Sequence, residues 1–167
     1  MPVFTVPRSL LRLATAALAL AMAGCAGSGI ESGGGGGGGG GGKNCTKPPP
    51  PTVFYGSNIQ PIYNRSCATS TACHIGATAG AGLQLTPGIS YGATVNVPST
   101  QQPRLLIIKP GDPDNSYLVR KIEGGPGIVG LQMPQGCPGT AQGGAVCLSA
   151  DDVAAIRTWI SECAQNN

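Results

Sequence analysis

Residues 67–74, CATSTACH, place Cys67 and Cys73 ahead of His74, and the second cysteine directly precedes the histidine. This order is the one used to attach a c-type haem: each thiol adds to a vinyl group, and the histidine binds the iron. The usual spacing is C-x-x-C-H, whereas five residues separate the cysteines here. Because the inserted residues are small and polar, we expect them to bulge outward while Cys67 still reaches its vinyl group.

The numbers of histidines and methionines in the chain also favour a haem site. His74 is the only histidine, and Met133 is the only methionine that remains once residues 1–24 are removed. One histidine and one methionine, in this order, supply a proximal and a distal ligand to a haem iron. Pro134 favours an extended backbone at Met133, which suits a thioether presented from a loop. The alternative is that Met133 fills an irregular gap in the core.

Two other interpretations of the same residues remain open. Small exported domains are often stapled by disulfides, so Cys67 and Cys73 can form a bridge while His74 lies at the surface. A zinc site needs four ligands, usually in pairs two to four residues apart, and this chain has one histidine.

Composition bounds the class of protein. The 167 residues suffice for one domain after the ends are removed. The net charge of +3 falls to +1 without Arg8 and Arg12, and 10% of residues are charged, so we expect no nucleic-acid partner. Aromatic residues make up 4%, which predicts a thin core that the apolar body of a haem would supplement. Seven cysteines favour an oxidising compartment.

Residues 1–24 resemble a bacterial lipoprotein signal peptide. Two arginines precede the apolar residues 13–23, which are too few to span a bilayer, and the stretch ends in Met22–Ala23–Gly24–Cys25. We expect Cys25 to become the acylated first residue of the mature chain, because several acyl chains give stable anchoring. A plain secretory signal cleaved near Gly24 is the alternative.

Residues 25–52 are predicted to be a linker between this anchor and a folded domain over residues 53–167. Gly33–Gly42 is an unbroken glycine run with nothing to bury, and Pro48–Pro51 is a short polyproline segment. We expect the linker to let a lipid-held domain move above a membrane, or to act as a passive spacer.

The folded domain is predicted to be mainly α-helical. The pattern indicates helices over Asn58–Arg65, Ser90–Val97 and Asn115–Glu123, an extended segment over Arg104–Lys109, and a loop over 124–147. A last helix follows the cap Ser149 and reaches Cys163, with acidic residues in its first turn and Val153, Ile156 and Ile160 on its buried face. We expect five apolar residues to line a haem: Ile59, Ile62, Leu83, Leu118 and Trp159.

These features together resemble a class I-type monohaem cytochrome c domain of bacterial secreted and lipid-anchored proteins. The resemblance covers most of residues 57–163, and its motifs are residues 59–63, Cys73–His74, the turn 109–116, Met133–Pro134 and the last helix, residues 148–163. It implies a small, mostly α-helical fold around one covalent haem c with His/Met axial ligation. By position, Cys67 and Cys73 hold the vinyl groups, His74 is the proximal ligand and Met133 the distal one. Lys109 and Lys121 are competing candidates for the distal position.

The resemblance implies an electron-transfer protein and not an enzyme, with no small-molecule substrate. Its expected partners are redox proteins of the cell envelope, bound weakly and transiently, and a membrane reached through the N-terminal lipid. The expected location is the bacterial envelope, at the outer membrane or the periplasmic face. The rival class is a haem-free, disulfide-stapled lipoprotein that acts as a binding or structural module. A third interpretation is an accessory domain of an oxidase or peroxidase.

Four cysteines remain once Cys25 carries lipid and Cys67 and Cys73 hold the haem. We predict that they pair as Cys137–Cys147, closing a short loop beyond Met133, and as Cys45–Cys163, joining the start of the domain to its last helix.

Overall fold

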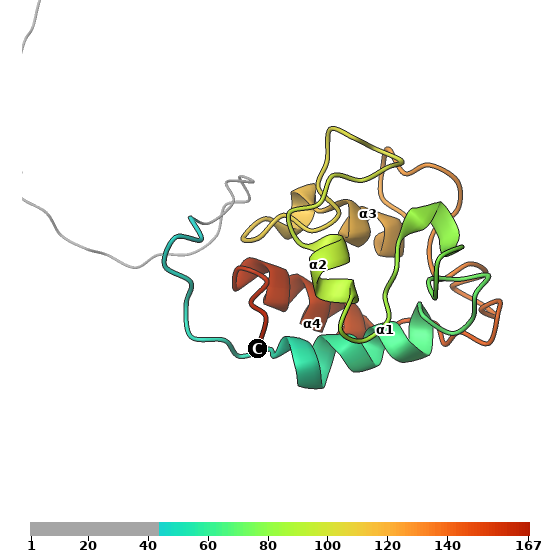
Figure 1. Ribbon diagram of the computed structural model, residues 1–167, viewed down its shortest axis with the longest axis horizontal. Coiled ribbons are helices and arrows are strands. Elements are labelled where there is room, and N and C mark those ends of the chain that lie inside the picture. Colours follow the sequence, from blue (N-terminus) through green and yellow to red (C-terminus); the bar gives the residue numbers. More distant parts are fainter. Residues whose placement is uncertain (1–43) are drawn as a thin grey trace, which may run out of the picture. The chain divides into compact units, whose positions relative to one another are not determined.

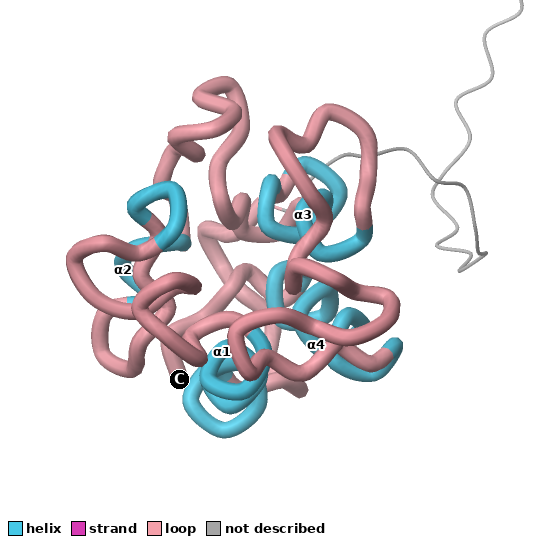
Figure 2. The backbone as a smooth tube through the Cα atoms, turned by 90° about the vertical axis from the view of Figure 1, so that its right-hand side faces the viewer, coloured by secondary structure: helices cyan, strands magenta, loops and turns pink. Residues whose placement is uncertain are grey.

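The computed structural model describes residues 44–167, shown in Figure 1. The expected signal peptide, the acylated Cys25 and the glycine run lie outside these residues. The described chain is mainly α-helical, with long loops between the helices, and its β pairing consists of three isolated bridges (Figure 2). No helix in residues 44–167 combines the length and the apolar character that crossing a membrane requires.

The first helical stretch starts earlier than the sequence indicated. A π-helical turn, Tyr55–Ile59, runs directly into α1, Gln60–Ser66. The predicted start at Asn58, with that side chain as the cap, is wrong, because its Oδ1 accepts a hydrogen bond from the Phe54 N–H at 2.9 Å, inside the preceding turn. The apolar face of this stretch is buried, as expected.

The second helix is shorter than predicted. α2 covers Ser90–Thr94, and the chain turns extended at Val95, with φ −79° and ψ 123°. The reason is that Val95 forms a bridge with Ile108, which lies in the extended segment expected from the sequence. The β-branched side chain of Val95 is well suited to that geometry.

The extended segment fixes where the third helix begins. Its Leu106 and Ile107 carbonyls accept hydrogen bonds from the Tyr117 and Leu118 N–H groups, at 2.9 and 3.0 Å. A 3-10 turn, Pro113–Asn115, precedes α3, Tyr117–Glu123. α3 is therefore held at its first turn by residues that precede it in the chain.

The last helix, α4, covers Ala150–Ser161, and its start confirms the predicted cap. The Ser149 side chain accepts a hydrogen bond from the Asp152 N–H, and the Asp152 side chain accepts one from the Ser149 N–H, which completes a capping box. The helix ends two residues before Cys163, whose φ of +74° is incompatible with continuing it.

Four aromatic side chains form one cluster in the core. Trp159 is fully buried, with its ring 5.2 Å from that of Tyr55 and 6.4 Å from that of Tyr91. Tyr63 joins this cluster through Tyr55, at 6.4 Å. Because α4 also packs against α3, it connects the first helical stretch to the second half of the chain.

The structure contains both disulfides expected from the sequence, Cys45–Cys163 and Cys137–Cys147, with Cα atoms 5.6 and 5.7 Å apart. Residues 44–52, which we assigned to the linker, are bound to the end of the chain. The Gln165 side-chain amide donates to the Pro49 carbonyl at 2.8 Å. The folded region therefore begins before the expected boundary at residue 53.

The buried position of Trp159 makes it the side chain whose removal should weaken the fold most. We expect Trp159→Ala to lower the free energy of unfolding by about 3–5 kcal/mol, because a large cavity would open between the helices. Urea unfolding followed by circular dichroism measures this change. Ile89→Ala is the control: Ile89 is 50% exposed, and its loss should change the free energy by less than about 0.5 kcal/mol. Equal effects of the two substitutions would contradict the assigned core.

Candidate functional site

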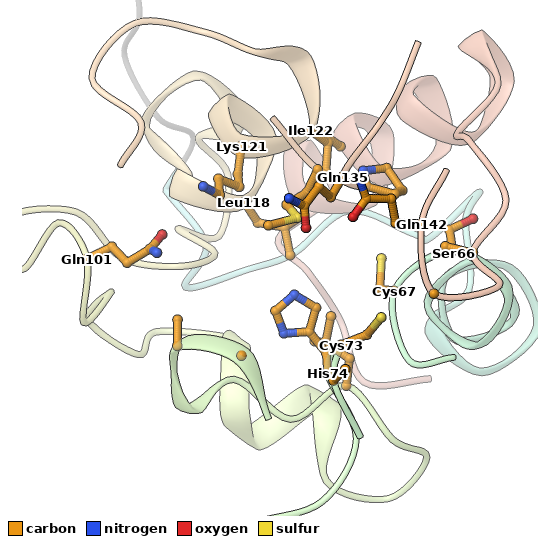
Figure 3. Close-up of a pocket in the computed structure, with 18 of the residues that line it drawn as sticks. Ser66, Cys67, Cys73, His74, Gln101, Leu118, Lys121, Ile122, Gln135 and Gln142 are labelled. Carbon is orange, nitrogen blue, oxygen red and sulfur yellow. The ribbon is translucent and has the colours of Figure 1, made fainter. Parts of the chain in front are cut away.

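A cavity of about 300 Å³ lies among several segments of the described chain. Its walls are formed by the turn that follows α1, by α3 and by the long loop after α3, and are completed by Gly80, Ala81, Leu85 and Gln101 from the chain between α1 and α3 (Figure 3). Its volume is at the lower end of the range for small-molecule sites. The apolar part of the wall is contributed mainly by Leu85, Leu118, Ile122 and Pro134.

All four side chains predicted to hold a haem line this one cavity: Cys67, Cys73, His74 and Met133. Met133 is brought there by its backbone, because its N–H donates to the Lys121 carbonyl of α3 at 2.9 Å. Cys67 and Cys73 are free thiols, so the structure does not contain the bridge considered as an alternative. Figure 3 shows both sulfur atoms on the same side of the His74 ring.

The insert between the cysteines bulges only in part, because Ala68 at its start is buried in the core. The His74 N–H donates to the Cys67 carbonyl at 3.2 Å, which brings the two ends of the insert together. Thr71 and Ala72, at its tip, are exposed. The longer spacing therefore still directs both thiols to the same cavity.

His74 is oriented by the backbone. Its Nδ1 lies 3.1 Å from the Leu83 carbonyl oxygen, which can only accept a hydrogen bond, so Nδ1 carries the proton. In the neutral ring Nε2 then keeps a free lone pair, as a metal-binding imidazole requires. Burial lowers the pKa of His74, hydrogen bonds with the Leu83 and Gly80 backbone oppose that shift, and the charge of Lys121 adds to it. Gly80 lies beside the ring, where a Cβ would be 3.6 Å from Cε1.

The two thiols have different surroundings. Burial raises the pKa of Cys67 to about 12, and the neighbouring Cys73 adds to this effect. Hydrogen bonds from the Ser70 and Thr69 hydroxyls, at 3.3 and 3.5 Å, lower the pKa of Cys73. Cys73 is therefore the more readily ionised of the pair.

The disulfide loop 137–147 covers the insert and the Cys73 thiol. The Thr69 hydroxyl donates to the Gly143 carbonyl at 2.9 Å, and the Val146 N–H donates to the Arg65 carbonyl at 3.0 Å. A Cβ on Gly143 would lie 2.9 Å from the Cys73 Sγ, closer than side-chain atoms approach. Sequence reasoning missed Thr69 and Gly143, and no local pattern marks them, because their contact joins distant segments.

The expected haem lining is largely wrong. Of the five residues named from the sequence, only Leu118 lines the cavity. The other four, Ile59, Ile62, Leu83 and Trp159, belong to the hydrophobic core or pack against it. The reason is that Ile59, Ile62 and Trp159 face the core between the first helical stretch and α4, and Leu83 packs against that core from the loop after His74, which leaves the cavity to other side chains.

The polar part of the cavity wall was not predicted either. It includes Gln101, Gln135 and Gln142, which come from three separate positions in the loops. Lys121, one of the two lysines considered as a competing ligand, also lines the cavity. Lys109 does not, and its Nζ pairs with the Asp112 carboxylate at 2.8 Å.

Comparisons with protein-family models, with curated proteins and with solved structures found no match to this chain. Within residues 44–167, His, Cys, Asp and Glu side chains form no group of three or more that could hold a metal ion. Any role for Cys67, Cys73, His74 and Met133 must therefore be argued from the chemistry of their side chains.

The close approach of Gly143 to Cys73 generates a test of the site. Gly143→Ala should displace the disulfide loop, because overpacking of this kind costs about 1–3 kcal/mol. We expect Cys73 to react with iodoacetamide roughly tenfold faster as a result. The measurement is peptide mass spectrometry of protein made without haem-attachment machinery.

Gly144→Ala is the matched control, because Gly144 also has a positive φ, +74° against +67° for Gly143, but a Cβ there would meet nothing within 4 Å. Equal alkylation rates in the two variants would show that the loop does not cover the thiol.

Proposed function

We propose that this protein is a single-haem c-type cytochrome that transfers electrons between redox proteins of a bacterial envelope. The observation that carries the proposal is the convergence of Cys67, Cys73, His74 and Met133 on one cavity, although Met133 is distant from the others in sequence. The absence of a bond between the two thiols leaves both available for attachment.

The chemistry of this donor set fits a covalent haem. Two thiols can form thioethers, a neutral imidazole can bind iron on one side, and a methionine thioether can bind it on the other. Bound there, the haem supplies an iron that changes between the ferrous and ferric states. Zinc would take a different set, because it needs four nitrogen, sulfur or carboxylate ligands in a tetrahedron.

The protein's own groups hold and tune these ligands. The Leu83 carbonyl fixes the ring of His74 through Nδ1, which makes Nε2 a better donor. The thioether of Met133 favours the reduced iron and raises the reduction potential. Leu118 and Ile122 add apolar surface to the wall of the site.

We propose the remaining assignments together with this function. Cys25 carries lipid and tethers the domain to a membrane of the envelope, and redox partners bind weakly and transiently. The second candidate is a haem-free lipoprotein that binds an apolar ligand in the same cavity. It is favoured by the two disulfides and the aromatic cluster, whose residues lie outside the cavity wall and stabilise the fold without a haem.

Covalent attachment is the decisive test of the proposed function. Protein made in a host with haem-attachment machinery should be coloured and carry the mass of one haem, which should survive denaturing electrophoresis. Cys73→Ala should abolish or sharply reduce this attachment. The intact mass and the visible spectrum of the purified protein measure attachment. A colourless wild-type protein with a Cys67–Cys73 bridge would contradict the proposal.

The distal ligand can be tested separately. Met133→Ala should leave attachment intact, because His74 and the thiols are unchanged. It should erase the sulfur-to-iron charge-transfer band of the ferric protein, lower the reduction potential and open the iron to carbon monoxide. Leu131→Ala is the control from the same loop, since Leu131 is 60% exposed and lies outside the cavity. If Met133→Ala keeps the band and the potential, Met133 serves only for packing.

A further inference from the structure

The cavity has two chemically different edges. Figure 3 shows Cys67 and Cys73 on one side of the His74 ring, and Lys121 and Gln101 on the opposite side. The residues that line the cavity include no aspartate or glutamate in the described chain. The edge away from the thiols therefore presents hydrogen-bond donors without an acidic side chain among them.

Lys121 is the charged donor of this edge. Its Nζ donates to the Val129 carbonyl, and within residues 44–167 it forms no salt bridge. The other charged side chains of α3 are engaged away from the cavity: Arg120 with Asn115 at 3.1 Å, and Glu123 with Arg157 at 3.1 Å. The ammonium of Lys121 therefore lies at the cavity without a carboxylate partner in the described chain.

Gln101 is the neutral donor. Its Oε1 accepts a hydrogen bond from the Tyr117 hydroxyl at 2.9 Å, and that hydroxyl in turn accepts one from the Val129 N–H at 3.0 Å. The side-chain oxygen of Gln101 is thus occupied, while its NH₂ group has no hydrogen-bond partner in the described chain. The amide is held in one orientation with its donors available.

An ammonium and an amide NH₂ at one edge suit a carboxylate, because charge-assisted hydrogen bonds to an anion are the strongest that such donors form. In a haem the two vinyl groups occupy adjacent pyrrole rings, and the two propionates occupy the other two. If the vinyl edge faces the thiols, the propionates must point to the opposite edge of the cavity.

We propose that Lys121 and Gln101 form the subsite that binds the propionate carboxylates and so sets the orientation of the tetrapyrrole against Cys67 and Cys73. This inference rests on the proposed function. Lys121 on this assignment is a positioning residue and not an iron ligand.

The test uses mesoporphyrin, which has no metal and no vinyl groups, and its dimethyl ester, which has no carboxylates. Both are titrated by fluorescence into the full chain made without haem-attachment machinery. The wild type should bind the acid at least roughly tenfold more tightly than the ester, as expected for a charge-assisted hydrogen bond to a carboxylate. Lys121→Met should reduce this ratio to about one to two, and Gln101→Leu should reduce it less.

Two further variants keep the result interpretable. Lys121→Arg retains the charge and should restore most of the preference for the acid. Lys47→Met makes the same charge change at an exposed residue outside the cavity and should leave the ratio unchanged. Urea unfolding of each variant shows that it is folded.

The outcomes separate the two proposals. If the wild type binds the acid and the ester equally, or if Lys121→Met keeps the wild-type ratio, the carboxylate subsite is wrong while the cytochrome proposal stands. If the wild type binds neither porphyrin and is colourless when made with the attachment machinery, the proposed function fails and this inference fails with it.

Discussion

The contact between the Trp159 indole and the Tyr55 ring, 5.2 Å apart, is the one on which the rest of the structure depends. It holds the first helical stretch on α4, and α4 in turn packs against α3. The turn after α1 and the side chains of α3 form two of the walls of the cavity. Four of the aromatic side chains of the described chain, Tyr55, Tyr63, Tyr91 and Trp159, lie where they connect its first and last helices.

The disulfides act at two different places. Cys45–Cys163 joins the start of the folded region to the residues after α4, and in the chain-entropy model a closure of this length contributes up to about 5 kcal/mol. Cys137–Cys147 closes the loop that carries Gly143 to the Cys73 thiol. The first bridge therefore supports the fold, whereas the second supports a wall of the site.

The polar groups of the site differ between the two sides of the His74 ring. Sulfur atoms lie on one side of His74, and the donors of Lys121 and Gln101 lie on the other (Figure 3). Between them, the Leu83 carbonyl keeps the imidazole in one tautomer. A flat ligand with one reactive edge and one acidic edge matches this arrangement, and a ligand without that polarity would leave the donors of the second edge unpaired.

The sequence by itself determined the features that depend on neighbouring residues. The capping box of Ser149 and Asp152, the burial of Ile156 and Ile160 on α4, the extended segment before the turn at 109–116, and the thiol–imidazole stretch are all local patterns, and the structure has each of them. The start of α1, the lining of the cavity and its polar edge were decided only by the tertiary structure. Gly143 meets Cys73, and Gln101 meets Tyr117, across segments far apart in the chain. No periodicity or spacing encodes such contacts, because they exist only after the helices have packed.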